Sequence, residues 1–102
     1  MTTLHTVNKS PFTQTTLSSC LQVCGVNDGI LLLEDGVFGA LASAPCANDM
    51  TVSINKGVKI YALVGDVKAR GLQTKLRPDI LLTDYDGFVQ LSIEHRCVQS
   101  WY

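Results

Sequence analysis

Three short, wholly apolar segments each run directly into an acidic turn, and this pattern constrains the fold more than any other feature. A strand without polar alternation is buried on both faces, as in a parallel sheet covered by helices. The glycine and acid that follow suit a strand-to-helix turn, because glycine tolerates positive φ and a carboxylate caps a helix. The sequence therefore predicts a small α/β layer protein with its functional loops at the carboxyl ends of the strands. The segments with their turns are 30–36, 59–66 and 80–87.

Amphipathic and turn signals place helices between these strands. Leu17, Cys20, Leu21 and Cys24 follow the i, i+3, i+4, i+7 spacing of a helix with one buried face, and Gly25 is its expected stop. The same reasoning predicts strands at 4–7, 30–33, 59–63, 80–82 and 97–102, and helices at 37–42, from Asn48 or Asp49 to 56, at 67–70 behind an Asp66 cap, and from Asp84 or Asp86 to 92.

Length and composition predict a single domain over residues 1–102 that is covered in part by a partner. The hydrophobic fraction of 46% is high beside a charged fraction of 17%, and a small domain cannot bury such an excess alone. A net charge of −1 argues against direct nucleic-acid binding. The sequence shows no bilayer-length apolar run and no secretory leader, so we expect a cytoplasmic protein with no membrane contact.

The four cysteines are expected to be reduced thiols, because a cytoplasmic compartment disfavours disulfides. There is no Cys-x-x-Cys pair and only two histidines, so no metal or other cofactor is expected. Cys20 and Cys24 lie one helical turn apart, which fits either a sulfur-handling pair or small apolar residues of the core stripe. Their position toward the helix carboxyl end disfavours a thiolate, since the helix dipole repels an anion there.

The remaining candidates have structural interpretations. Cys46 lies in a polar stretch and is expected to be an exposed, incidental thiol. His95 and Arg96 precede Cys97, but they are weak evidence for a reactive thiol, because neighbours in a strand point to opposite faces. Helix capping accounts for Asp66 and Asp84 better than a phosphorylation or metal site does. His5, inside the first strand, is expected to be a hydrogen-bonded core histidine rather than a catalytic base.

Several stretches together resemble one family, and they follow its order from end to end. The opening Leu-His-Thr-Val-Asn-Lys-Ser-Pro-Phe and the closing Val-Gln-Ser-Trp carry the resemblance at the two ends of the chain. On this basis the sequence resembles the DsrH/TusB family of sulfur relay proteins. The matching stretches are 4–12, 31–37, 58–63, 66–71, 83–89 and 98–101.

The resemblance implies a three-layer α/β/α sandwich on a mainly parallel five-stranded sheet. It also implies a subunit of a cytoplasmic heterohexamer, a sulfurtransferase complex with two copies each of DsrE-, DsrF- and DsrH-like chains. Such complexes pass sulfur as a cysteine persulfide to a DsrC/TusE-like acceptor. The main sulfur-carrying cysteine belongs to the E-type partner, so this chain is expected to be an accessory subunit that is not catalytic alone.

Cys20, together with the Thr-Val-Asn-Lys-Ser-Pro-Phe opening and the Gln-Ser-Trp ending, favours one branch of the family. This sequence resembles the H-type chains of sulfur oxidisers, which carry a cysteine at the position that matches Cys20. The resemblance implies that Cys20 binds sulfur in intracellular sulfur oxidation. The alternatives are a TusB-type subunit of the relay that forms 2-thiouridine at the tRNA wobble position, and a purely structural subunit with inert cysteines. A stand-alone thiol enzyme is a further alternative, which inability of the isolated chain to mobilise sulfur would exclude.

Overall fold

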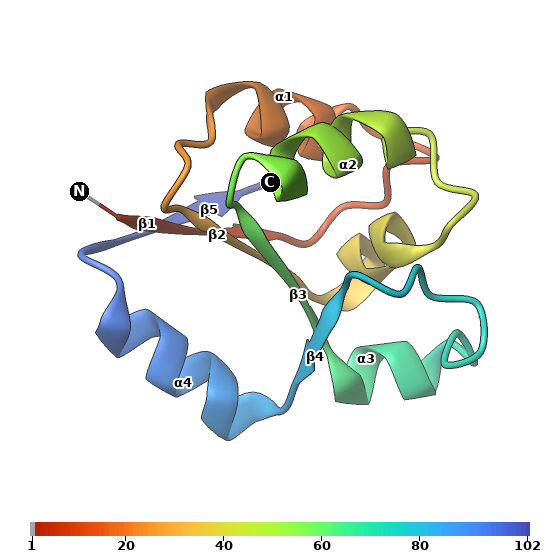
Figure 1. Ribbon diagram of the computed structural model, residues 1–102. Coiled ribbons are helices and arrows are strands. Elements are labelled where there is room, and N and C mark those ends of the chain that lie inside the picture. The colour runs from red at the N-terminus through yellow and green to blue at the C-terminus, as the bar shows by residue number, and fades with distance from the viewer. Residues whose placement is uncertain (1) are drawn as a thin grey trace.

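The computed structural model describes residues 2–102, and its centre is a sheet of five parallel strands (Figure 1). The order across the sheet is β4-β3-β2-β1-β5, so the first strand is flanked by the second and the last. The strands are β1 (Thr3–Val7), β2 (Gly29–Leu32), β3 (Lys59–Leu63), β4 (Leu81–Thr83) and β5 (Cys97–Trp101). The helices are α1 (Thr16–Val23), the 3-10 helix η1 (Glu34–Ala40), α2 (Ala47–Asn55), α3 (Val64–Ala69) and α4 (Tyr85–Glu94).

Helices cover the sheet on both sides, which confirms the predicted three-layer sandwich with a parallel sheet. In Figure 1, α1 and α2 lie above the sheet and α4 lies below it. The upper face holds the larger core, in which Cys20 of α1 and Met50 of α2 pack on Ile30 and Ile60 of the strands. On the lower face Leu91 of α4 packs on Leu4 of β1 and Leu31 of β2 in a smaller cluster.

Burial on both faces is found for β2 but not for β3 or β4, so this part of the sequence prediction is wrong. All four residues of β2 are buried, whereas burial alternates along β3 and Leu81 and Leu82 of β4 are about half exposed. The reason lies in position, since β4 is an edge strand and, among residues 2–102, the lower-face cluster around Leu91 of α4 includes no residue of β4. An uninterrupted apolar run therefore marks an uncovered edge here as well as a buried centre.

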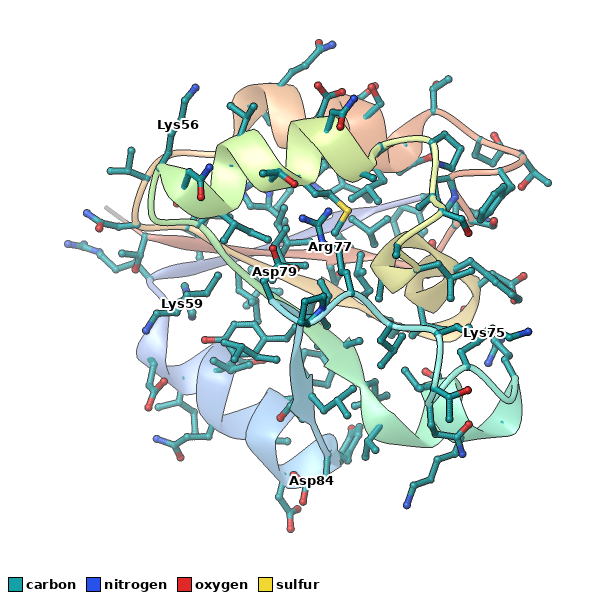
Figure 2. The ribbon with its side chains drawn as sticks, turned by 45° about the vertical axis from the view of Figure 1, so that its right-hand side comes forward. Lys56, Lys59, Lys75, Arg77, Asp79 and Asp84 are labelled. Atoms are coloured by element: carbon teal, nitrogen blue, oxygen red, sulfur yellow. The ribbon has the colours of Figure 1, made fainter. Side chains whose placement is uncertain are left out.

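The acidic turns stabilise the structure in two different ways. Asp84 caps α4 as predicted, since its Oδ1 accepts a hydrogen bond of 2.8 Å from the Gly87 N–H, and Figure 2 shows it at the start of that helix. Asp66 is not a cap, because α3 already begins at Val64. Its Oδ2 instead accepts the N–H of Glu34 at 2.7 Å, and Glu34 has a left-handed φ of 51°. The Asp66 carboxylate thus stabilises a strained turn on the neighbouring strand.

A buried arginine fixes the long connection between α3 and β4 against α2. Figure 2 shows Arg77 and Asp79 side by side in front of the sheet, and the guanidinium contacts both carboxylate oxygens at 2.6 and 3.0 Å. Arg77 also donates to the Ala47 carbonyl at 2.9 Å and the Thr51 hydroxyl at 2.6 Å. The Arg77 hydrogen bond holds the pKa of Asp79 below its usual value, against the opposing effect of burial.

We expect Arg77→Met to lower the free energy of unfolding by about 2 kcal/mol or more, because it leaves a hydroxyl, a carbonyl and a carboxylate without their donor. The matched control is Arg70→Met, which breaks the Arg70–Asp35 pair at 3.0 Å, whose carboxylate is 63% exposed. An exposed pair of this kind contributes less than about 1 kcal/mol. Urea unfolding followed by the fluorescence of Trp101, the single tryptophan, measures both losses. Equal losses in the two variants would contradict this ranking.

Candidate functional site

Two thiols meet on the inner side of α1 at its carboxyl end. The Sγ atoms of Cys20 and Cys24 are 3.9 Å apart, because residues four apart in a helix share a face. Cys20 is fully buried in the upper core, whereas Cys24 is only partly buried. Cys24 is the residue after the last helical turn, where its N–H still bonds to the Cys20 carbonyl at 3.2 Å while its ψ of 133° is extended. The pair therefore has one interior and one accessible member.

The pKa values of the two thiols shift in opposite directions. The hydrogen bond to Cys24 raises the pKa of Cys20, and burial and the nearby Asp28 raise it further. The same contact lowers the pKa of Cys24 and outweighs the opposing effects of burial and Asp28, which is the effect expected when the buried Cys20 S–H is the donor. We therefore assign the proton of the S–H···S hydrogen bond to Cys20, so that Cys24 is the thiol that ionises first. The sequence predicts that the helix dipole disfavours a thiolate at either cysteine, and Cys24 departs from this expectation while Cys20 does not.

A hydrogen-bonded chain of three side chains lies beside the thiols and includes His5 of β1. The Trp101 indole donates to His5 Nδ1 at 3.0 Å, so this nitrogen carries a lone pair and the ring proton is assigned to Nε2. His5 Nε2 then donates to Asp28 Oδ2 at 2.9 Å. Both ring nitrogens are engaged and the residue is buried, which confirms His5 as a satisfied core histidine rather than a base.

Asp28 ties the loop after α1 to the first strand. Its carboxylate accepts hydrogen bonds from the Thr3 N–H at 3.0 Å and the Gly25 N–H at 3.0 Å, in addition to the one from His5. Burial opposes ionisation of Asp28, but the hydrogen bonds from Gly25, His5 and Thr3 outweigh it and hold the pKa of this carboxyl below its ordinary value of 3.8. The negative charge next to the thiols is thus permanent at neutral pH.

His5, Cys20 and Cys24 place three potential metal ligands within 4.8 Å of one another. A histidine that binds a metal through one nitrogen normally donates its other N–H to a carboxylate. Asp28 supplies that carboxylate at Nε2, but Nδ1, the nitrogen left for a metal, already accepts the indole N–H of Trp101. The arrangement therefore does not fit a metal ion without breaking the Trp101 bond.

The other thiols and acids lie apart from this cluster. Cys46 was expected to be exposed, and this expectation is wrong: it precedes α2 and is buried in the upper core, and burial raises its pKa. Cys97 is exposed on the edge strand β5. Asp35 and Asp66 both lie against Arg70, at 3.0 and 3.7 Å, so their role is structural. Sequence reasoning overlooked Asp28, although the spacing Gly25-x-x-Asp28 is the signal of the tight loop it closes.

We expect Asp28→Asn to lower the free energy of unfolding at neutral pH by about 1–3 kcal/mol, because an amide cannot accept all three hydrogen bonds and carries no charge. A depressed carboxyl pKa contributes stability above the unfolded-state value of about 3.9, and that contribution is lost as the pH falls through the folded-state value. The variant should therefore lose less stability on acidification than the parent. The matched control is Asp86→Asn, an exposed acid in the first turn of α4, with an expected loss below about 1 kcal/mol. Identical acid-unfolding profiles of parent and Asp28→Asn would refute this role for Asp28.

Solved structures of similar fold agree with this architecture. The ychN protein from E. coli superposes with a TM-score of 0.81 at 15% identity, covering 98% of this chain and 99% of the other. MTH1491 from Methanobacterium thermoautotrophicum superposes with a TM-score of 0.75 at 11% identity, covering 96% and 97%. At such identities the likeness concerns the fold. Within residues 2–102, no helix has the length and apolarity needed to cross a bilayer.

Sequence relatives identify the family. The chain is 36% identical over 98 residues to protein TusB of Escherichia coli (strain K12), which covers 96% of this chain and 99% of the relative. TusB of Serratia proteamaculans (strain 568) gives the same identity and coverage. The family model described as DsrH like protein matches residues 9–98. On this evidence, the chain belongs to the DsrH/TusB family.

Proposed function

We propose that the chain is a TusB-type subunit of a cytoplasmic sulfur relay that supplies the sulfur of 2-thiouridine at the tRNA wobble position. The observation that carries the proposal is the 36% identity to E. coli TusB over nearly the whole of both chains. This favours the tRNA branch over the sulfur-oxidation branch that Cys20 suggested in the sequence. Sulfur oxidation remains the second candidate, because the matching family model is that of DsrH and the cysteine of the H-type chains is present.

An uncovered apolar stripe on α4 supports the role of a subunit. Tyr85, Val89 and Ile93 follow one another at four-residue spacing and are 67%, 44% and 72% exposed. Phe88 and Leu91 face the opposite way and pack on the sheet. A helix that is apolar on both sides is typical of a buried one, so a second protein surface is expected to cover the outer stripe. Chains related to DsrE and DsrF, in a heterohexamer with two copies of each subunit, are the proposed partners.

The chemistry of the chain fits relay rather than RNA modification. Its thiols can exchange persulfide sulfur without a cofactor, since the sulfane sulfur moves from one thiolate to the next. With a net charge of −1 the chain lacks the excess of cations that a phosphate backbone attracts. We therefore assign tRNA contact to other components, and propose a DsrC/TusE-like protein as the acceptor of the sulfur.

Removal of the chain from its own cells is expected to abolish 2-thiouridine in tRNA and to leave the oxidation of stored sulfur intact. Mass spectrometry of digested tRNA measures the first, and sulfate release from sulfur-loaded cells measures the second. Normal thiouridine together with blocked sulfate release would reject the tRNA branch in favour of sulfur oxidation.

The subunit role predicts that Val89→Glu prevents co-purification with the E- and F-type chains, because a buried unpaired carboxylate costs several kcal/mol, on the order of 3–5. The fold should survive, since Val89 is 44% exposed in the isolated chain. Val52→Glu is the matched control, because Val52 is 52% exposed on α2 at the opposite side of the sheet. Circular dichroism verifies folding of both variants. Undiminished co-purification of Val89→Glu would show that the partner binds elsewhere.

A further inference from the structure

Access to the thiol pair is one-sided. Cys20, the cysteine to which the sequence points, has no exposed surface, so a sulfur donor outside the protein cannot reach its Sγ. Cys24 is partly exposed and stands between Cys20 and an exposed loop at 25–27. Val23 and Val26, which lie one position before and two positions after it in sequence, are 61% and 55% exposed. Within this pair, thiol exchange with a partner must begin at Cys24.

We propose that Cys24 is the sulfur-accepting thiol of this chain and that Cys20 is a positioning residue, which donates its buried S–H to the Cys24 sulfur. This deepens the relay function proposed above and rests on it. The 3.9 Å between the two Sγ atoms and the different burial of the two residues carry the assignment. The lowered pKa of Cys24 agrees with it, because the thiolate is the form that attacks.

The transfer step involves no net oxidation. The Cys24 thiolate attacks the outer sulfur of a donor persulfide, R–S–SH, and forms a new S–S bond. The S–S bond of the donor breaks, and its electron pair leaves with the R–S⁻ thiolate, which takes a proton from water. The product is a Cys24 persulfide. In discharge, the thiolate of an acceptor protein attacks the same outer sulfur, and Cys24 leaves as the thiolate.

The protonated state of Cys20 protects this persulfide. A Cys20 thiolate at this distance could attack the inner sulfur of Cys24, form a disulfide and expel hydrosulfide, which would waste the carried sulfur. The bond to Cys24, burial and the charge of Asp28 all raise the pKa of Cys20 and keep it a thiol. Asp28 thus acts against a side reaction, through its position beside the pair.

The test exposes the chain to glutathione persulfide at neutral pH, blocks the remaining thiols and locates the added sulfur by mass spectrometry. Chymotrypsin cuts after Leu21 and separates Cys20 from Cys24. We expect the added sulfur on the Cys24 fragment, its loss in Cys24→Ser, and its retention in Cys97→Ser, the control for an exposed thiol. Sulfur on Cys20 or on Cys97 alone, equal loading of Cys24→Ser, or loading of no cysteine would overturn the assignment.

Two Cys20 variants test the hydrogen bond separately. Cys20→Ala removes the donor, so the pH of half-maximal loading at Cys24 should rise by about one unit. Cys20→Ser supplies a hydroxyl donor and should restore the parent profile, a rescue that a purely structural role does not predict. Parent-like profiles in both variants would refute the donor role of Cys20. Thiouridine content and co-purification with the partner chains test the relay function independently of sulfur loading. If the chain is needed for thiouridine and co-purifies with its partners but loads no sulfur, this inference is refuted and the proposed function stands.

Discussion

Burial of the two central strands on both faces is the constraint on which the rest of the structure depends. Leu4 and Val7 of β1 and Ile30, Leu31 and Leu32 of β2 have no exposed surface, which requires a helical layer above and another below. The larger core is closed by α1, α2, η1 and Val67 of α3, and the lower layer is supplied by α4. The outer strands are covered less completely, and the apolar residues left there are available to partners.

The candidate site is assembled where this core meets its periphery. His5 lies on β1, Trp101 on β5 and Asp28 in the loop before β2. The two thiols at the end of α1 lie next to His5. The permanent carboxylate disfavours thiolates nearby, and a single S–H···S contact directs ionisation to the outer sulfur. Hydrogen bonding between the two thiols, rather than surface charge, thus determines which of them ionises first.

Local sequence pattern was sufficient for the layers but not for the contacts between them. The amphipathic spacing of α1 and the cap at Asp84 depend on residues a few positions apart, and both are confirmed. The Asp66 contact with Glu34 and the Trp101 contact with His5 join residues 32 and 96 positions apart, which no local pattern reports. The pairing of Cys20 with Cys24 could be foreseen from helical spacing, whereas the contact of Asp28 with His5, 23 positions away, could not.

Parallel pairing of β5 with β1 sets Thr3 opposite Cys97 and Val7 opposite Trp101. During protein synthesis β1 therefore emerges before the other four strands, and its second neighbour, β5, follows only when almost all of the described chain has left the ribosome. One edge of β1 and the Nδ1 atom of His5 lack their native partners throughout that interval, because Trp101 arrives with β5. Nascent chains stalled before residue 97 should consequently be targets for chaperones that bind open strand edges.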